Sequence, residues 1–447
     1  MFEGLLAYTL DRLDSVLDYY DWEMAILKDY LAKEMPKYSF AFLADYLFHL
    51  IAKDELTDDE VKQKESLYEK LKSNLDLPDE QPEKEQGIVR YRIINKEQIV
   101  DKSICTDVGL GAKQYRKLLD MPTMLSFNAL SLLVTRFEEF LSDYLEILFR
   151  NYSAKYIDKQ TIRFEDIAEL KCTEQIRDFL VQQEVEKQMH QDYKSLIKLL
   201  ENNHRMKFDN INGKLQELYE VSARRNIWVH NSGKVNSTYM GIVSNTKYNI
   251  GECAMITCEY LTNTIQIMKT VIVAIMLESA KLVCKDDVAE YLSDIFDTAF
   301  DALQNKDYEF CIYVFGVLKE LKDLPADQRL MAQVNYWIAT IGLNGSDSVK
   351  AEIAKWDVSA YDKAFSLAKE VLLEHFTRAT KLLESLYING ELSNLEITTW
   401  PLFEVFRQSK EYVEFTQKYA ADFGAQTMKI NEESDIAECI TPEPENE

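Results

Sequence analysis

The sequence predicts an all-α protein. Glycine and proline are scarce, with 13 and 8 residues among 447, whereas sheet-rich folds need many such turn residues. Apolar residues recur at spacings of three and four over most of the chain, which is the period of an amphipathic helix. The length favours two to four domains and provides ample surface for a buried core.

The first predicted region, residues 1–122, is mostly helical. Residues 6–34 repeat apolar side chains at helical spacing. Two prolines, a glycine and many charges at 77–87 predict a loop or a flexible joint. The β-branched, alternating segment IVRYRII at 88–94 predicts one short strand. Residues 107–122 predict a turn followed by a short helix.

The second region, residues 123–285, is predicted to be a helical bundle. Its first helix is long and amphipathic, with an apolar stripe of Leu130, Val134, Phe137, Leu141 and Leu145. Further helices are expected at about 173–189, 191–202, 213–231 and 252–285. The most apolar stretch, 265–277, is too short to span a bilayer and contains Lys269, so it predicts a buried helix.

The third region, residues 286–430, is predicted to contain helical hairpins. Tyr308 and Phe376 occupy similar segments twice the 34-residue tetratricopeptide period apart, which predicts a tetratricopeptide-like array. The unit between them matches poorly, and an irregular helical domain explains the pattern equally well. The acidic, apolar-poor tail at 431–447 is predicted to be disordered.

Composition restricts the function classes. A formal net charge of -25 argues against non-specific nucleic-acid binding, because an acidic surface repels phosphate. Seven widely spaced cysteines without a CxxC pair favour free thiols in a reducing cytosol. With few histidines and no tight Cys/His cluster, we expect no metal or other cofactor. The acidic N-terminus does not resemble a signal peptide, so we expect a cytoplasmic protein without a membrane partner.

One stretch departs from the acidic background. From Val221 to Gly251 there is no Asp or Glu, although 76 acidic residues among 447 would place about five in such a window. Several asparagines and four cations lie there, namely Arg224, Arg225, Lys234 and Lys247. An anionic ligand could bind here despite the overall charge, although acid-free windows also arise by chance in a long chain.

The same stretch predicts the end of a helix. Its buried stripe is Leu215, Tyr219, Ala223 and Ile227, and Gly233 is a suitable stop. Asn226 and His230 are four residues apart and share a face. Arg225 and His230 are five apart, about 140° around an unbroken helix. They converge if the helix frays before His230, if the arginine reaches around, or if two copies meet across a two-fold axis.

Arginine, histidine and asparagine form a minimal set for metal-free RNA cleavage. RNA carries its own nucleophile, the 2′-hydroxyl, and an imidazole with a pKa of about 6.5 can move its proton near neutral pH. A guanidinium binds phosphate oxygens through its planar fork. The spacing alone is a weak signal, because a histidine near an apolar stripe is usually structural.

The segment RRNIWVHNSGKVN at 224–236 resembles the signature of the HEPN superfamily, in which an arginine followed by a polar residue precedes a histidine by four to six residues. Residues 137–152 are similar to the first long helix of that domain, and the resemblance covers about 123–285. It implies an all-helical bundle, a homodimer with the active cleft between protomers, and metal-independent ribonuclease activity that leaves 2′,3′-cyclic phosphate ends. It also implies a role in phage defence, abortive infection or a toxin–antitoxin system.

The resemblance assigns roles to three residues. His230 would be the general acid/base, Arg225 the phosphate clamp, and Asn226 the residue that orients the histidine or the phosphate. Ser232 stands where small toxins of the family often carry a tyrosine, which disfavours that subtype. Residues 1–122 lack the pattern of a nucleotide-binding α/β domain, which disfavours activation by cyclic oligoadenylate.

Three further residues are weaker candidates for substrate binding. Arg224 and Lys234 could contact RNA, although solvated surface is the simpler interpretation of both. Asn231 could contact RNA or cap the helix.

Two functions remain open at this point. The first is a metal-independent endoribonuclease with RNA as its substrate. The alternative is a non-catalytic, HEPN-like dimeric scaffold that binds another protein through its helical hairpins. In a combined version, the flanking regions sense a phage trigger or a regulatory protein partner and hold the nuclease in check.

Overall fold

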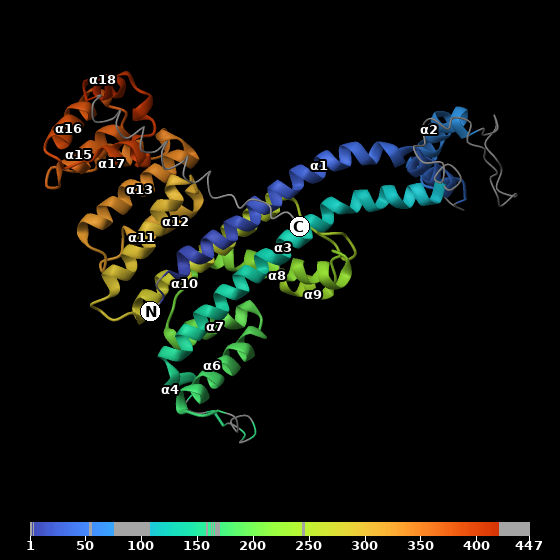
Figure 1. The fold of residues 1–447 in the computed structure, drawn as a ribbon, viewed down its shortest axis with the longest axis horizontal. Helices are drawn as coiled ribbons and strands as arrows, with labels where there is room; N and C mark the ends of the chain where they lie inside the picture. Colours follow the sequence, from blue (N-terminus) through green and yellow to red (C-terminus); the bar gives the residue numbers. More distant parts are fainter. Residues whose placement is uncertain are drawn as a thin grey trace, which may run out of the picture. The chain divides into compact units, whose positions relative to one another are not determined.

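The computed structural model describes residues 4–52, 56–75, 108–157, 170–243 and 246–419, together with Phe2 and a few single positions between 160 and 165. The described residues form helices joined by short loops (Figure 1). No strand occurs among them, and their isolated β-bridge joins Lys234 and Cys253. The all-α prediction is therefore confirmed for the described part of the chain.

The described residues before position 76 are mostly helical, as predicted. Helix α1 runs over Leu5–Ala52 and continues through Pro36, and helix α2 covers Asp58–Leu75. The loop predicted at 77–87 and the strand predicted at 88–94 lie outside the described residues.

Helix α3 corrects the prediction for residues 107–122. It is one helix of 44 residues, Val108–Asn151, and Pro122 lies inside it. A proline removes one helical hydrogen bond, but the helix carries buried apolar residues on both sides of it, such as Leu118 and Leu130. This packing outweighs the local propensity. The predicted boundary between residues 122 and 123 therefore falls within a continuous helix.

Helices α1 and α3 lie side by side over much of their length (Figure 1). The Tyr20 and Ser126 hydroxyls are 3.1 Å apart, and the Phe42 and Tyr115 rings stack with centroids 4.6 Å apart. Arg12 on α1 pairs with Glu139 on α3 at 2.9 Å. These contacts make the two helices antiparallel partners.

The helices predicted at 173–189, 191–202, 213–231 and 252–285 are present with shifted ends. They are α6 (Thr173–Met189), α7 (Tyr193–His204), α8 (Asn212–Asn231) and α10 (Cys258–Ser279). The short helices α4 (Ser153–Tyr156) and α9 (Ser237–Ile242), and 3₁₀ turns at Asp209–Ile211 and Ala280–Leu282, were not predicted. Residues 265–277 lie in α10 and are buried except for the partly exposed Gln266, as predicted.

The C-terminal region contains shorter helices. They are α11 (Val288–Gln304), α12 (Tyr308–Leu318), α13 (Ala326–Asn344), α14 (Lys350–Lys355), α15 (Lys363–Leu372), α16 (Phe376–Ile388), α17 (Asn394–Thr399) and α18 (Lys410–Lys418), with 3₁₀ turns at Ser346–Ser348, Pro401–Phe403 and Phe406–Gln408. Tyr308 and Phe376 begin α12 and α16. The tetratricopeptide period itself stays a prediction, and the tail at 431–447 lies outside the described residues.

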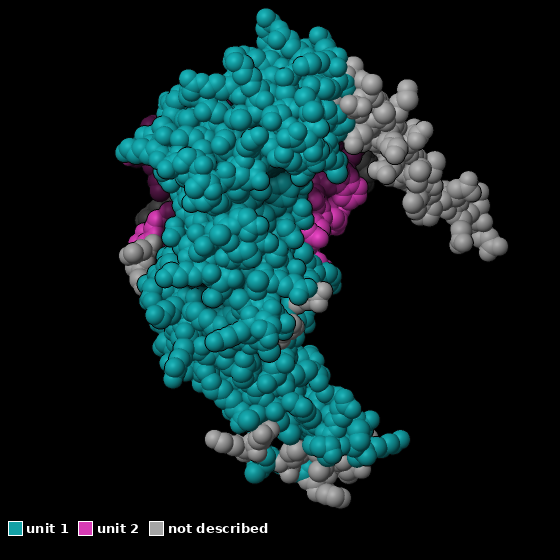
Figure 2. Space-filling model, turned by 90° about the vertical axis from the view of Figure 1, so that its left-hand side faces the viewer, with its two compact units in different colours: residues 1–8, 142–215, 266–447 teal, residues 9–141, 216–265 magenta. Residues whose placement is uncertain are grey.

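The chain forms two compact units that are interleaved along the sequence (Figure 2). Unit 1 comprises residues 1–8, 142–215 and 266–447, and unit 2 comprises residues 9–141 and 216–265. The boundaries fall inside α1, α3, α8 and α10. The predicted regions are consecutive in sequence, whereas each of these units combines segments that are distant in sequence.

Each unit has its own core. In unit 1, the Phe2 and Tyr144 rings stack with centroids 4.9 Å apart, and the Tyr144 hydroxyl lies 2.8 Å from that of Ser279. In unit 2, one core cluster gathers residues of α8, α9 and the loops before and after α9, namely Ala223, Ile227, Val235, Tyr239 and Ala254.

Two helices are long and apolar enough to cross a membrane by length and composition alone. They span Leu110–Asn151 and Cys258–Leu282. Core helices of soluble proteins pass the same test, and 78% of the most apolar window of the second helix is buried inside the protein.

Candidate active site

The end of α8 is fixed by its backbone. The helix is unbroken to Asn231, and then Ser232 and Gly233 adopt positive φ angles of 49° and 75°. The Gly233 amide donates to the Ile227 carbonyl at 3.1 Å, a helix-ending pattern. A Cβ on Gly233 would lie 2.6 Å from Trp228 Cε2. Fraying before His230 is therefore excluded as the way to bring Arg225 and His230 together.

The loop after α9 holds this helix end in place. Trp228 Nε1 donates to the Ala254 carbonyl at 2.7 Å, and its ring stacks on Phe127 of α3 with centroids 6.1 Å apart. The Ala254 amide donates to the Gly233 carbonyl at 2.9 Å. The last turn of α8 is thus attached to both α3 and the following loop.

His230 and Asn226 lie exposed on the last two turns of α8. Within the described part of the chain, neither side chain has a hydrogen bond or an ion pair to the protein. Their spacing of four residues places them on one face of the helix. An imidazole and an amide in this position are accessible to a ligand from solvent.

Arg225 is half-buried and paired. Its Nη2 donates to Glu138 Oε1 of α3 at 2.9 Å, and the two side chains are 28% and 35% exposed. Because α8 is unbroken, Arg225 and His230 are about 140° apart around it. Of the three ways to bring them together, a reaching arginine and a second copy of the helix remain.

Arg224 serves the interior of unit 2. It is 7% exposed, its Nε donates to Glu220 Oε1 at 2.7 Å, and its Nη1 donates to the Met255 carbonyl at 2.8 Å. Its guanidinium also lies 4.0 Å from the centroid of the Tyr260 ring. These contacts occupy the side chain within the protein, so we do not include Arg224 among the residues proposed to contact RNA.

Glu220 is the centre of this buried cluster. Its carboxylate accepts hydrogen bonds from the hydroxyls of Tyr239 at 2.5 Å and Tyr260 at 2.8 Å, in addition to Arg224. Burial and the bond to Glu220 raise the pKa of Tyr239 to about 12. Burial lowers the pKa of Arg224, but Tyr260 and Glu220 raise it more, and the net shift is upward. The cluster therefore keeps a neutral phenol beside an ion pair.

The remaining predicted residues lie at the surface. Lys234 is exposed and has no ion pair within the described residues. Asn231 Nδ2 donates to the Lys234 carbonyl at 2.6 Å, so this side chain helps to close the end of the helix.

Two residues that matter to the site were missed by the sequence analysis. Glu220 is four residues before Arg224, and this spacing alone predicts an intrahelical ion pair. Glu138 lies within the segment 137–152 that resembles the first HEPN helix. No local pattern indicates its contact with Arg225, because the two residues are 87 positions apart.

No group of three or more His, Cys, Asp or Glu side chains that could hold a metal ion occurs among the described residues. Comparisons with protein-family models, with curated proteins and with solved structures found no match.

Proposed function

We propose that the protein is a metal-independent endoribonuclease that acts as a homodimer. The observation that carries this proposal is the exposed imidazole of His230, one turn after the exposed amide of Asn226, on a helix end that is fixed from two sides. The resemblance of residues 224–236 to the HEPN signature supports the same reaction.

In the proposed reaction, the 2′-oxygen of RNA attacks the adjacent phosphorus, and His230 accepts the 2′-hydroxyl proton. The bond from phosphorus to the 5′-oxygen breaks, and this oxygen takes up a proton. The products are a 2′,3′-cyclic phosphate and a 5′-hydroxyl. A positioned acid or base contributes about 10²–10⁴ in rate. Asn226 would orient the imidazole or the phosphate.

Arg225 would bind the phosphate by exchanging its partner. Its present partner is the Glu138 carboxylate in a partly exposed pair. Such pairs contribute about 0–1 kcal/mol, so an RNA phosphate can displace the carboxylate at low cost. The exchange would bring a fixed positive charge to the phosphate oxygens as negative charge develops.

Self-association is part of the proposal because α8 is unbroken. The exposed stripe of α1 that would form the interface is aromatic and apolar, with Tyr19, Trp22, Ile26 and Tyr30 at spacings of three and four. Trp22 is 60% exposed, and Met124 on the neighbouring α3 is 62% exposed. Helix α8 contacts the same part of α3 through Phe127 and carries the exposed Val229.

Charge favours a second copy as the partner of this stripe. Exposed carboxylates flank it on α1 at Asp18 and Asp29, and the exposed Lys33 continues it, whereas α3 presents Lys113, Lys117 and Asp120 at helical spacing with Met124. The carboxylates beside the aromatic stripe of one chain could therefore pair with the α3 lysines of another. RNA and anionic lipid are poor partners for the α1 face, because its carboxylates repel phosphate.

The biological setting follows from the resemblance alone. We place the nuclease in phage defence, abortive infection or a toxin–antitoxin system in the cytoplasm. The helices of unit 1 would respond to a phage trigger or a regulatory protein partner.

A non-catalytic scaffold is the second candidate. The observation that favours it is the Arg225–Glu138 pair, because a phosphate clamp that is already occupied by a carboxylate also fits a structural role.

Cleavage without metal tests the first candidate. The purified full chain is incubated with transfer RNA and with structured RNA in EDTA, and product ends are identified. We expect cleavage that leaves 2′,3′-cyclic phosphates, and a loss of at least about 100-fold in His230→Ala. His190→Ala is the matched control, because His190 is also exposed at a helix end.

A requirement for magnesium, or full activity in His230→Ala, would refute the proposed mechanism. Absence of cleavage together with a stoichiometric complex between the full chain and a regulatory protein would favour the scaffold.

A further inference from the structure

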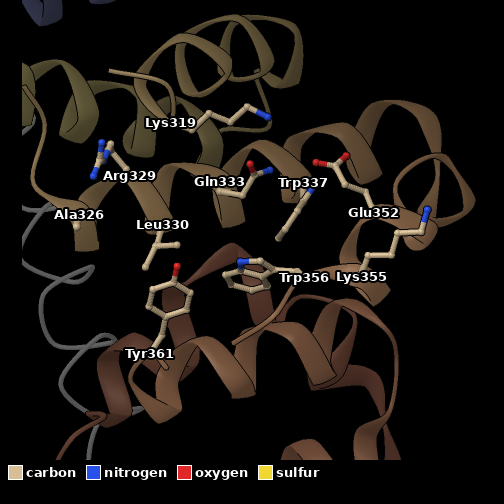
Figure 3. Close-up of a pocket in the computed structure, with 10 residues that line it drawn as sticks. All are labelled: Lys319, Ala326, Arg329, Leu330, Gln333, Trp337, Glu352, Lys355, Trp356 and Tyr361. Atoms are coloured by element: carbon tan, nitrogen blue, oxygen red, sulfur yellow. The ribbon is translucent and has the colours of Figure 1, made fainter. Parts of the chain in front are cut away.

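A cavity of about 410 Å³ lies in the C-terminal part of unit 1, between α13, α14 and residues 356–361 (Figure 3). Its walls carry apolar and aromatic side chains, and Figure 3 shows Trp356 and Tyr361 facing Leu330 and Trp337 of α13. Tyr361 is 47% exposed, whereas Trp356 and Leu330 are half-buried. The cavity therefore leaves apolar surface accessible, and a ligand with apolar side chains would remove this surface from water.

Three cations lie at separate edges of this cavity. Figure 3 shows Arg329 and Lys355 at opposite ends and Lys319 at another edge. None of the three has an ion pair within the described residues, and Lys319 Nζ lies 3.9 Å from the centroid of the Tyr336 ring. One carboxylate, that of Glu352, lines the same cavity. A small anion would reach one of these cations at a time, whereas an extended peptide with several carboxylates would reach them together.

The sequence after α18 contains a segment with this chemistry. Residues 432–440, EESDIAECI, which we call the acidic segment, carry four carboxylates together with the apolar Ile436 and Ile440. Residues 420–447 as a whole contain eight acidic residues and one lysine, and they lie outside the described residues. The acidic segment therefore combines negative charges with apolar side chains, as the cavity combines positive charges with apolar surface.

The cavity is within reach of the acidic segment. Helix α18 packs on α16, α16 packs on α15, and Phe365 of α15 contacts the Trp356 ring at the cavity with centroids 6.2 Å apart. Helices in contact lie about 8–10 Å apart, so these three steps span about 30 Å. Twelve residues, 420–431, connect the end of the described chain to the acidic segment. An extended chain of this length covers about 40 Å.

We propose that the acidic segment binds in this cavity of its own chain. Its carboxylates pair with the three cations at the separate edges, and Ile436 and Ile440 cover the exposed aromatic surface. The covalent connection gives the segment an effective concentration in the millimolar range, so individually weak contacts suffice. The inference concerns unit 1 and does not depend on the proposed nuclease site on α8.

Disulfide trapping in the full chain tests the proposal, because the acidic segment contains Cys439. A disulfide requires the two Cα atoms to come within about 7 Å of each other. Glu352→Cys introduces a thiol at the cavity without removing a cation. Glu391→Cys is the matched control, because Glu391 is exposed just after α16, the helix on which α18 packs. A segment that moved at random would meet this control position at least as often as the cavity.

Mass spectrometry identifies the bonds that form under mild oxidation. Each rate is divided by the rate at which the same thiol reacts with a small neutral disulfide, because nearby charges change thiol reactivity. We expect the bond from Cys439 to position 352 to form at least about tenfold faster than the bond to position 391, because bound and unbound segments differ in effective concentration. Thermal unfolding of both variants establishes that they are folded.

Charge dependence provides a second readout. Glu432→Gln, Glu433→Gln and Asp435→Asn, combined in the Glu352→Cys chain, alter no further described residue. They should slow the bond to position 352 at least about threefold, as should Arg329→Ala, because each removes part of the ion pairing.

Equal rates at the two positions would overturn the proposal, as would a rate at position 352 that the charge variants leave unchanged. A bond to Cys439 of a second chain, seen as a covalent dimer, would also contradict binding within one chain. His230→Ala should leave the bond at position 352 unaffected, so failure of the nuclease proposal and failure of this one are separate results.

Discussion

The two adjacent arginines of α8 have different environments because consecutive helical residues point about 100° apart. Arg224 turns toward the interior and joins Glu220 and Tyr260, whereas Arg225 turns toward Glu138 at a partly exposed position. Both arginines belong to the acid-free stretch of the sequence. Which of them points into the interior depends on the elements that cover each face of α8, and the sequence does not show these. Asn226 and His230, by contrast, were predicted to share a face and do so.

His204 provides a prediction about pH. It is 9% exposed, its Nε2 lies 2.5 Å from the Tyr156 hydroxyl, and burial together with Lys155 lowers its pKa to about 4. The unfolded chain binds a proton near the ordinary pKa of about 6.5, whereas the folded chain does not. The free energy of unfolding should therefore fall as the pH drops from about 6.5 to 4, by an amount on the order of 2 kcal/mol.

Urea denaturation of the parent chain and of His204→Phe at pH 7 and pH 4.5 measures this effect. The phenyl ring can still pack on Tyr152 and Tyr156 but does not titrate, so the variant should lose less stability between the two pH values. His190→Phe is the control at an exposed position. Equal losses in the parent and His204→Phe would contradict the assignment.

At the scale of the elements, apolar periodicity predicted most helices and failed at residues 107–122, where a turn and a short helix were expected. The helix expected at 173–189 has those same limits in α6. Helix α3 continues through Pro122 because long-range packing, which a local pattern does not contain, outweighs the lost hydrogen bond. The contact between Trp228 of α8 and Phe127 of α3 could not be predicted from the sequence either, because no spacing rule connects such distant positions.

Gly233 provides a prediction about the end of α8. Gly233→Ala places a methyl group at a φ of 75° and against the Trp228 ring. We expect a loss of about 1–3 kcal/mol in the free energy of unfolding, measured by urea denaturation, and a change in tryptophan fluorescence. Gly213→Ala in the first turn of the same helix is the control, because its Cβ would meet open space. If Gly233→Ala left the free energy of unfolding unchanged, the helix end would not be fixed as described.

At the scale of the whole molecule, composition predicted the helical class but not the arrangement of the units. Unit 2 combines residues 9–141 with residues 216–265, and unit 1 contains the segments before, between and after them. Changes in composition along a chain indicate loops. The boundaries between the two units fall inside helices, so no change in composition indicates them.

Self-association is the prediction at this scale. Sedimentation should show the parent chain as a dimer, and Trp22→Asp or Ile26→Asp should raise its dissociation constant more than tenfold, because each buries a charge in the proposed apolar contact. High salt should also weaken the dimer, since its carboxylates face lysines. Ile388→Asp, on an exposed site of α16, is the control. A parent chain that stays monomeric at all concentrations would contradict the proposal.

The interleaving of the units has a consequence for dividing the chain into fragments. Because His230 lies in unit 2, a continuous fragment that contains all of this unit spans at least residues 9–265 and carries residues 142–215 of unit 1 with it. A shorter fragment that contains His230 lacks part of that unit.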